Sequence, residues 1–220
     1  RAPAAASAMP HVATRSMTLA DAVRTASFWL IVAAFFFGNV CSGTLLVHQV
    51  VYLVDHGLAA IVAASVVSAV GMSSIIGKTG GGWLSDHVDR ELVFVAGMAI
   101  LVMSVGVLAA LGAAPSRWGA YGFAVLLGLG YSVTAAIIPA IMSDRFRGPH
   151  FGSIMGVGML GSATGSALGP WFAGYLFDLT GSYALPFLIA AACGVAAGVA
   201  GWLARVLRMR AVVGSPKDFS

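Results

Sequence analysis

Six long apolar stretches dominate this 220-residue sequence and limit the folds that it can adopt. The stretches span residues 28–54, 56–85, 92–114, 118–143, 151–177 and 179–204. Their only Lys, Arg, Asp or Glu residue is Lys78, in the second stretch. Each is long enough to cross the hydrocarbon core of a bilayer, which takes ~20 apolar residues as a helix. Backbone amides inside lipid must bond within their own segment, so helices are expected. The predicted fold is an all-α polytopic membrane protein with six transmembrane helices.

The composition agrees with this fold class and excludes several functions. Only 9% of the residues are charged, against about 25% in soluble domains, so a water-soluble fold is excluded. The net charge is +4, but no basic patch interleaved with aromatic residues indicates nucleic-acid binding. Cys41 and Cys193 lie inside apolar stretches and match no ligand spacing, so neither a disulfide nor a metal site is expected. The lipid bilayer is the predicted partner, and no cofactor is predicted.

The basic residues are divided unequally between the two ends of the expected bundle. Six spans place both termini on one side, and that side holds all but two of the 12 Lys and Arg residues. The exceptions are Arg117, on the opposite side, and Lys78, within a span. Because cytoplasmic loops of membrane proteins carry an excess of Lys and Arg, both termini are predicted to lie in the cytoplasm. The expected location is the plasma or inner membrane.

Polar residues recur in a three-plus-three pattern along the six stretches. The first, second, fourth and fifth stretches contain Ser, Thr, Tyr, Asn or His, whereas the third and sixth contain almost none. Transporters built from inverted three-helix repeats are expected to show such a pattern in each half. Alternatively, Ser and Thr only satisfy backbone carbonyls of their own helices. The pattern favours two inverted repeats and leaves this alternative open.

Three motifs resemble a known family. Residues 82–90, Gly-Trp-Leu-Ser-Asp-His-Val-Asp-Arg, resemble the G-x-L-x-D-x-x-x-R loop of the major facilitator superfamily, although Asp89 replaces a usual Gly and Glu91 a common basic residue. Residues 144–152 and 165–174 are similar to a loop and helix of its monocarboxylate and oxalate/formate branch. The resemblance implies helices seven to twelve of a twelve-helix fold, so that the N-terminal six-helix half is a missing partner.

The resemblance also sets the expected domain boundaries. Residues 1–17 would be the end of a central cytoplasmic loop, 18–210 the six-helix bundle and 211–220 a cytoplasmic tail. The start at Arg1 instead of Met suggests a fragment or a processed product. Residues 1–26 lack the Leu-rich core of a signal peptide and are interpreted as a flexible linker.

Lys78 is the main candidate for substrate binding. An ammonium at this depth costs ~2.5–3.5 kcal/mol on insertion scales, so it normally faces a cavity or a partner. In the resembling branch, an Arg at this position of the eighth helix binds the substrate carboxylate. Alternatively, Lys78 extends to the cytoplasmic surface. Ser74 lies on the same helix face, where proton-coupled relatives carry an acidic residue; a hydroxyl cannot carry the proton, so the coupling ion is left open.

Further polar residues are assigned to the same substrate site. His48 and Tyr52 lie one turn apart, and are interpreted as substrate or proton-binding groups near the outer mouth. Alternatively, His48 is neutral and bonds to a neighbouring helix. Tyr131 and Ser132, from the fourth stretch, complete the predicted site.

Other residues are assigned to gating and packing. By resemblance, Asp86, Arg90 and Asp144, with Gly82 in the same motif, close the cytoplasmic end; alternatively, these charges are only solvated. The regularly spaced glycines are predicted to allow close helix contact, and the prolines within spans to bend their helices; these residues are Gly161, Gly165, Gly169, Pro139 and Pro170.

An enzyme is not expected. An intramembrane serine protease needs a histidine on a span after its nucleophile, but Ser132 is followed only by His150, in a loop. The predicted function is transport of small organic anions, most simply monocarboxylates, by alternating access with Lys78 neutralising the carboxylate. Transport of another small solute, such as oxalate/formate exchange, and a non-transporting scaffold or sensor remain as alternatives.

Overall fold

The computed structural model describes residues 17–213 and contains six long helices. They are α2 (Ala26–Asp55), α3 (Ala60–His87), α4 (Arg90–Ala113), α5 (Arg117–Arg145), α6 (Phe151–Thr180) and α7 (Ala184–Val213). Each overlaps one predicted apolar stretch, although α3 and α7 begin four and five residues after their stretches do. The all-helical fold class is thus confirmed for the described residues.

Local sequence signals explain where the helices begin and end. Thr25 and Ser116 cap the first turns of α2 and α5, accepting hydrogen bonds from the backbone amides of Phe28 and Gly119. Gly181 ends α6 in the left-handed conformation, with φ of 64°, which glycine adopts without steric cost. The turns between the apolar stretches are therefore encoded locally.

The N-terminal region departs from the expected linker. A short helix, α1 (Leu19–Val23), precedes α2. Thr18 and Asp21 form a reciprocal capping box at its start, which stabilises even a single turn. The interpretation of residues 1–26 as a flexible linker is wrong for this part. At the other end, α7 runs three residues beyond the predicted boundary at 210. The remaining parts of the predicted linker and tail, residues 1–16 and 214–220, lie outside the described residues.

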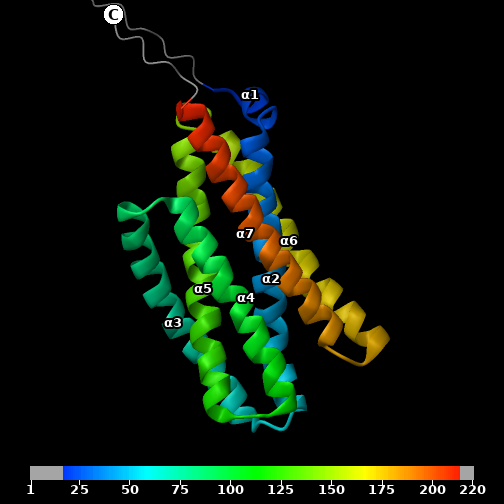
Figure 1. Ribbon diagram of the computed structural model, residues 1–220. Coiled ribbons are helices and arrows are strands. Elements are labelled where there is room, and N and C mark those ends of the chain that lie inside the picture. Colours follow the sequence, from blue (N-terminus) through cyan, green and yellow to red (C-terminus); the bar gives the residue numbers. More distant parts are fainter. Residues whose placement is uncertain (1–16, 214–220) are drawn as a thin grey trace, which may run out of the picture.

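The six long helices pack in matching pairs. α3 packs along α5 and α6 along α2, while α4 lies against α5 and α7 against α2. α4 and α7 also contact each other. Figure 1 shows α4 and α7 in front of α2 and α5, with α3 and α6 at the two flanks. We call the end that holds α1 and the last turn of α7 the terminal end, and the opposite one the distal end.

Five of the described helices are long and apolar enough to cross a membrane: α2, α3, α4, α5 and α7. The sixth long helix, α6, is not among them, although it has 30 residues. Seven of these are glycines, and several others are Ser or Thr, which lowers its hydropathy. α6 packs lengthwise against α2. That α6 is a sixth membrane span stays a prediction.

Candidate functional site

A small polar cavity lies between α2, α5 and α6. Its volume is about 100 Å³. Polar side chains from all three helices line it, together with the ring of Phe94 from α4; they are Asn39, Ser42, Tyr131, Thr134 and Ser162. Such a concentration of polar groups inside apolar helices is expected where a polar solute binds.

The cavity extends from mid-height in the bundle toward the terminal end. Tyr131 is the central residue of α5, and Asn39 lies close to the middle of α2. Substrate sites of secondary transporters lie near the bilayer midplane, between repeats. The depth of this cavity therefore suits a transport site.

Lys78 reaches Tyr131 from the neighbouring helix α3. Its Nζ lies 5.9 Å from the centroid of the Tyr131 ring, within the range of a cation–π interaction. Lys78 is exposed, and takes part in none of the ion pairs found among residues 17–213. Tyr131 also lines the polar cavity, so its ring lies between Lys78 and that cavity.

Asn39 both lines this cavity and joins two helices. Its side-chain amide donates a hydrogen bond to the carbonyl oxygen of Phe35, at 2.8 Å, while its own carbonyl oxygen accepts one from Ser166 of α6, at 3.0 Å. The second bond closes one side of the cavity by holding α6 against α2.

His48 lies outside the polar cavity, in a contact between α2, α6 and the start of α7. Its Nδ1 lies 3.2 Å from the hydroxyl of Tyr183, and its Nε2 lies 3.0 Å from the carbonyl oxygen of Pro170. Both ring nitrogens thus have partners within the bundle. This geometry corresponds to the alternative in which His48 joins neighbouring helices.

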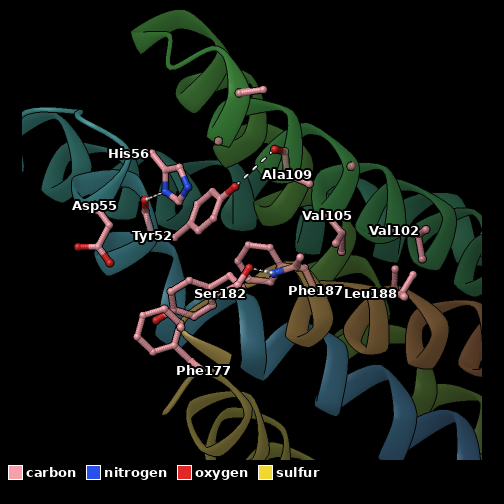
Figure 2. A pocket seen from close by; sticks show the side chains of 17 residues that line it. Tyr52, Asp55, His56, Val102, Val105, Ala109, Phe177, Ser182, Phe187 and Leu188 are labelled. Atoms are coloured by element: carbon pink, nitrogen blue, oxygen red, sulfur yellow. Dashed lines mark hydrogen bonds between the residues drawn. The ribbon is translucent and has the colours of Figure 1, made fainter. Parts of the chain in front are cut away.

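Tyr52 is buried and lines a different cavity, at the distal end. Its hydroxyl donates a hydrogen bond to the carbonyl oxygen of Ala109, at 3.4 Å, and its ring lies 4.1 Å from that of His56. Figure 2 shows both rings beside α4. The structure therefore does not bring His48 and Tyr52 together with Lys78.

Ser74 and Ser132 lie in the contact between α3 and α5, and both are buried. Their hydroxyls donate to carbonyl oxygens of their own helices, at 2.7 Å to Gly71 and 2.6 Å to Gly128. Ser132 also occupies the space that a side chain at Gly77 would need. Of the predicted substrate residues, only Tyr131 lines the polar cavity, and Lys78 lies over its ring.

Arg90 connects two acidic residues at the terminal end. Its guanidinium lies 3.6 Å from Asp86 and 3.2 Å from Asp144. Asp144 also pairs with Arg147, at 3.1 Å. Gly82, one helical turn before Asp86, faces open space. The three residues assigned to the gate thus form one chain of ion pairs.

A second ionic cluster at this end was not predicted. Glu91 is only 3% exposed and lies 3.4 Å from Arg145 and 3.2 Å from Arg208. Asp89 pairs with Arg208, at 2.9 Å, and with Arg205, at 2.8 Å. Hydrogen bonds from these two arginines hold the pKa of Asp89 below its usual value. The sequence did contain a signal for this cluster, because Asp89 and Glu91 replace the residues that the family usually has at these positions.

Three of the predicted packing glycines approach the backbone of α2. A side chain at Gly161, Gly165 or Gly169 would collide with the carbonyl oxygen of Val32, Phe36 or Val40, respectively. The prolines lie within continuous helices: Pro139 of α5 lines the polar cavity, and Pro170 of α6 accepts the bond from His48.

Comparison with known proteins identifies a family. Residues 28–218 match the Major Facilitator Superfamily. Similar proteins are the uncharacterized MFS-type transporter YcxA of Bacillus subtilis (strain 168), 28% identical over 138 residues, monocarboxylate transporter 13 of Bos taurus, 30% over 150, and the hexuronate transporter of Bacillus subtilis (strain 168), 28% over 181. The alignments cover 60%, 66% and 75% of this chain, but only 32%, 34% and 40% of these relatives. The chain thus spans well under half of their length.

Proposed function

The chain belongs to the major facilitator superfamily, and we propose that it forms half of a secondary transporter for small organic anions, with monocarboxylates as the substrate class. The family consists of transporters and not of enzymes, so the protease alternative is discarded. The observation that carries the proposal is Lys78, the only formal charge within the apolar stretches, held over the ring of Tyr131, which lies at the middle of α5 and lines the polar cavity.

The names of two relatives support a carboxylate substrate. One is a monocarboxylate transporter and the other a hexuronate transporter, and both kinds of compound carry a carboxylate. The ammonium of Lys78 attracts that group, whereas Asn39 and Ser42 can hydrogen-bond other oxygens of the substrate. Lys78 is a point charge and not a planar fork, so the site would tolerate several orientations of the carboxylate.

The proposed mechanism is alternating access. Substrate binds between this six-helix bundle and a second, N-terminal one, and the two halves rock about it. The first three long helices (α2, α3 and α4) make the same kinds of contact as the last three (α5, α6 and α7), which supports two inverted repeats with α6 as the sixth span. The chain Asp86–Arg90–Asp144 lies where the terminal end would close, and by the positive-inside rule this end is cytoplasmic.

The test uses the full-length protein that contains this chain, reconstituted into vesicles. We expect uptake of labelled lactate, pyruvate or formate, and a loss of at least about tenfold in kcat/KM in Lys78→Gln, since a charge-assisted contact contributes roughly 1.5–3 kcal/mol. Lys78→Arg should retain part of the activity. Arg117→Gln is the matched control, because Arg117 also lies over an aromatic ring, Trp118 at 5.3 Å, but at the distal end.

Other outcomes would distinguish the alternatives. Exchange of oxalate for formate, without net lactate uptake, would assign the chain to dicarboxylate exchange. Carboxylate uptake unchanged by Lys78→Gln would show that the site is wrong, and no uptake of any organic anion would contradict the proposed function itself.

A further inference from the structure

A long furrow follows the contact between α4 and α7. At the distal end it widens into a cavity of about 810 Å³, and a second cavity of about 460 Å³ continues toward the terminal end. Val102 lines both, so the two cavities adjoin at this residue. Along α4 the furrow runs from Ala113 to Val95, or about 27 Å at 1.5 Å per residue. This is close to the ~30 Å of a bilayer's hydrocarbon core.

The furrow changes from polar to apolar along its length. Figure 2 shows Asp55, His56 and Tyr52 at one end, and Val105, Leu188 and Val102 along the other. The second cavity is lined by apolar residues and glycines, except for Trp202 at its far end, whose ring is also largely apolar. The furrow therefore has a polar mouth at the distal end and an apolar trough toward the terminal end.

The polar mouth is negatively charged. Asp55 is exposed, and the ion pairs found within residues 17–213 all lie at the terminal end and do not include it. Burial, and then the charges of Asp55 and Asp178, raise the pKa of Tyr183 beside it. Arg117, a basic residue at the distal end, lies over Trp118 and does not line the cavity.

The shape and the charge of the furrow suit a lipid. Flexible acyl chains fit a narrow apolar trough of membrane length. A carboxylate at the mouth favours an ammonium headgroup, through a charge-assisted hydrogen bond, and repels a purely anionic one.

We propose that this furrow binds one phospholipid with a primary ammonium headgroup, its acyl chain along α4 and α7 and its ammonium at Asp55. The lipid would lie on the face of the bundle formed by the two helices that are poorest in polar residues, separate from the polar cavity beside Lys78. The site is independent of the transported substrate.

The test is lipid retention by the full-length protein, measured by native mass spectrometry. The purified protein is mixed with equal amounts of phosphatidylethanolamine and phosphatidylglycerol of identical acyl chains. We expect one phosphatidylethanolamine to be retained roughly tenfold more than phosphatidylglycerol, as for one charge-assisted hydrogen bond. Asp55→Asn should make the two lipids equal.

Two variants of α4 separate the furrow from ordinary lipid contact. Gly106→Phe should abolish retention, because it fills the trough, and its Cβ meets nothing within 4 Å, so the fold should tolerate it. Met103→Phe, on the same helix but 59% exposed and outside both cavities, should have no effect. If Gly106→Phe does not fold, Gly198→Phe fills the second cavity instead.

Three results would overturn the proposal. They are equal retention of both lipids by the wild type, retention that survives Gly106→Phe, and a dimer or a partner protein that Gly106→Phe displaces. The last result would identify the furrow as a contact surface for another helix.

Discussion

Asp89 and Glu91 tie three helices together at the terminal end. Both lie at the junction of α3 and α4, and their arginine partners come from α5 and α7. Glu91 is buried, so each of its charge-assisted contacts forms in a medium of low dielectric and resists screening. The two residues that depart from the family's usual loop thus form an ionic cluster within this bundle.

The Asp89 cluster should make stability depend on pH. The pKa of Asp89 is lowered in the folded protein, so its stabilisation is complete above the unfolded value, about 3.9, and is lost as pH falls through the lower folded value. Asp89 is 38% exposed, so screening limits the contribution to about 1 kcal/mol. Asp89→Asn should therefore lower the thermal midpoint of the full-length protein in detergent at pH 7 by roughly 1–2 °C, since the shift per kcal/mol falls with chain length.

The same measurement near pH 3 supplies the contrast. The difference between wild type and Asp89→Asn should shrink there, because the wild-type carboxyl is becoming protonated. Asp86→Asn is the matched control, since Asp86 is 67% exposed and its single pair is longer, at 3.6 Å. A difference that stays constant with pH would show that the Asp89 pairs contribute no measurable stability.

Only part of the candidate site could be predicted from the sequence. Lys78 could be identified from the sequence because a charged residue inside an apolar stretch is visible without knowledge of its contacts. The Glu91–Arg145 and Asp89–Arg205 pairs join residues 54 and 116 positions apart, and no local pattern specifies such contacts. The cavity formed by Asn39, Tyr131 and Ser162 likewise depends on how three helices pack.

At the scale of elements, the contact between α2 and α6 depends on glycine. Within a bilayer, helices associate through close packing and not through the hydrophobic effect. Gly161, Gly165 and Gly169 follow one another at intervals of four residues, and each lies against the backbone of α2. The same small residues that reduce the hydropathy of α6 thus bring it close to its neighbour.

A pair of Gly→Ala variants in α6 should have opposite effects. At Gly165 a Cβ would collide with the carbonyl oxygen of Phe36, so Gly165→Ala should destabilise the bundle by about 1–3 kcal/mol. At Gly156 a Cβ meets nothing within 4 Å, so Gly156→Ala should stabilise α6 by up to about 1 kcal/mol, through helix propensity alone. Thermal unfolding of the full-length protein in detergent compares the two. Equal midpoints for both variants would contradict the close contact.

The elements themselves were largely predictable, for a physical reason. Lipid requires each span to satisfy its own backbone, so apolar stretches between charges predict helices. The short helix α1 was missed because its signal is only the capping pair Thr18 and Asp21. α6 was predicted as a helix, but its hydropathy falls below that expected of a membrane span. Its close packing against α2 depends on small residues, which lower the hydropathy.

At the scale of the whole molecule, ionic contacts and polar cavity occupy different levels of the bundle. The ion pairs of the described chain gather at the terminal end, whereas the polar cavity begins deeper and reaches mid-height. A rocking transporter needs contacts at its ends that form in one state and break in the other. Contacts confined to this bundle, such as Glu91–Arg145, would instead keep it rigid during such a movement.

Arg90 and Asp144 should therefore affect turnover more than substrate binding. Arg90 is partly buried between Asp86 and Asp144, and we expect Arg90→Gln to change kcat for carboxylate transport several-fold while KM stays within about twofold, since a change in closure leaves the Lys78 site intact. Asp144→Asn should act in the same direction, and a double-mutant cycle decides whether the two act as one unit. If they do, the double variant is no worse than the more damaging single one. Additive effects on kcat would show that Arg90 and Asp144 act separately. An unchanged kcat, or a rise in KM alone, would show that this chain of ion pairs is a solvated surface feature without a role in closure.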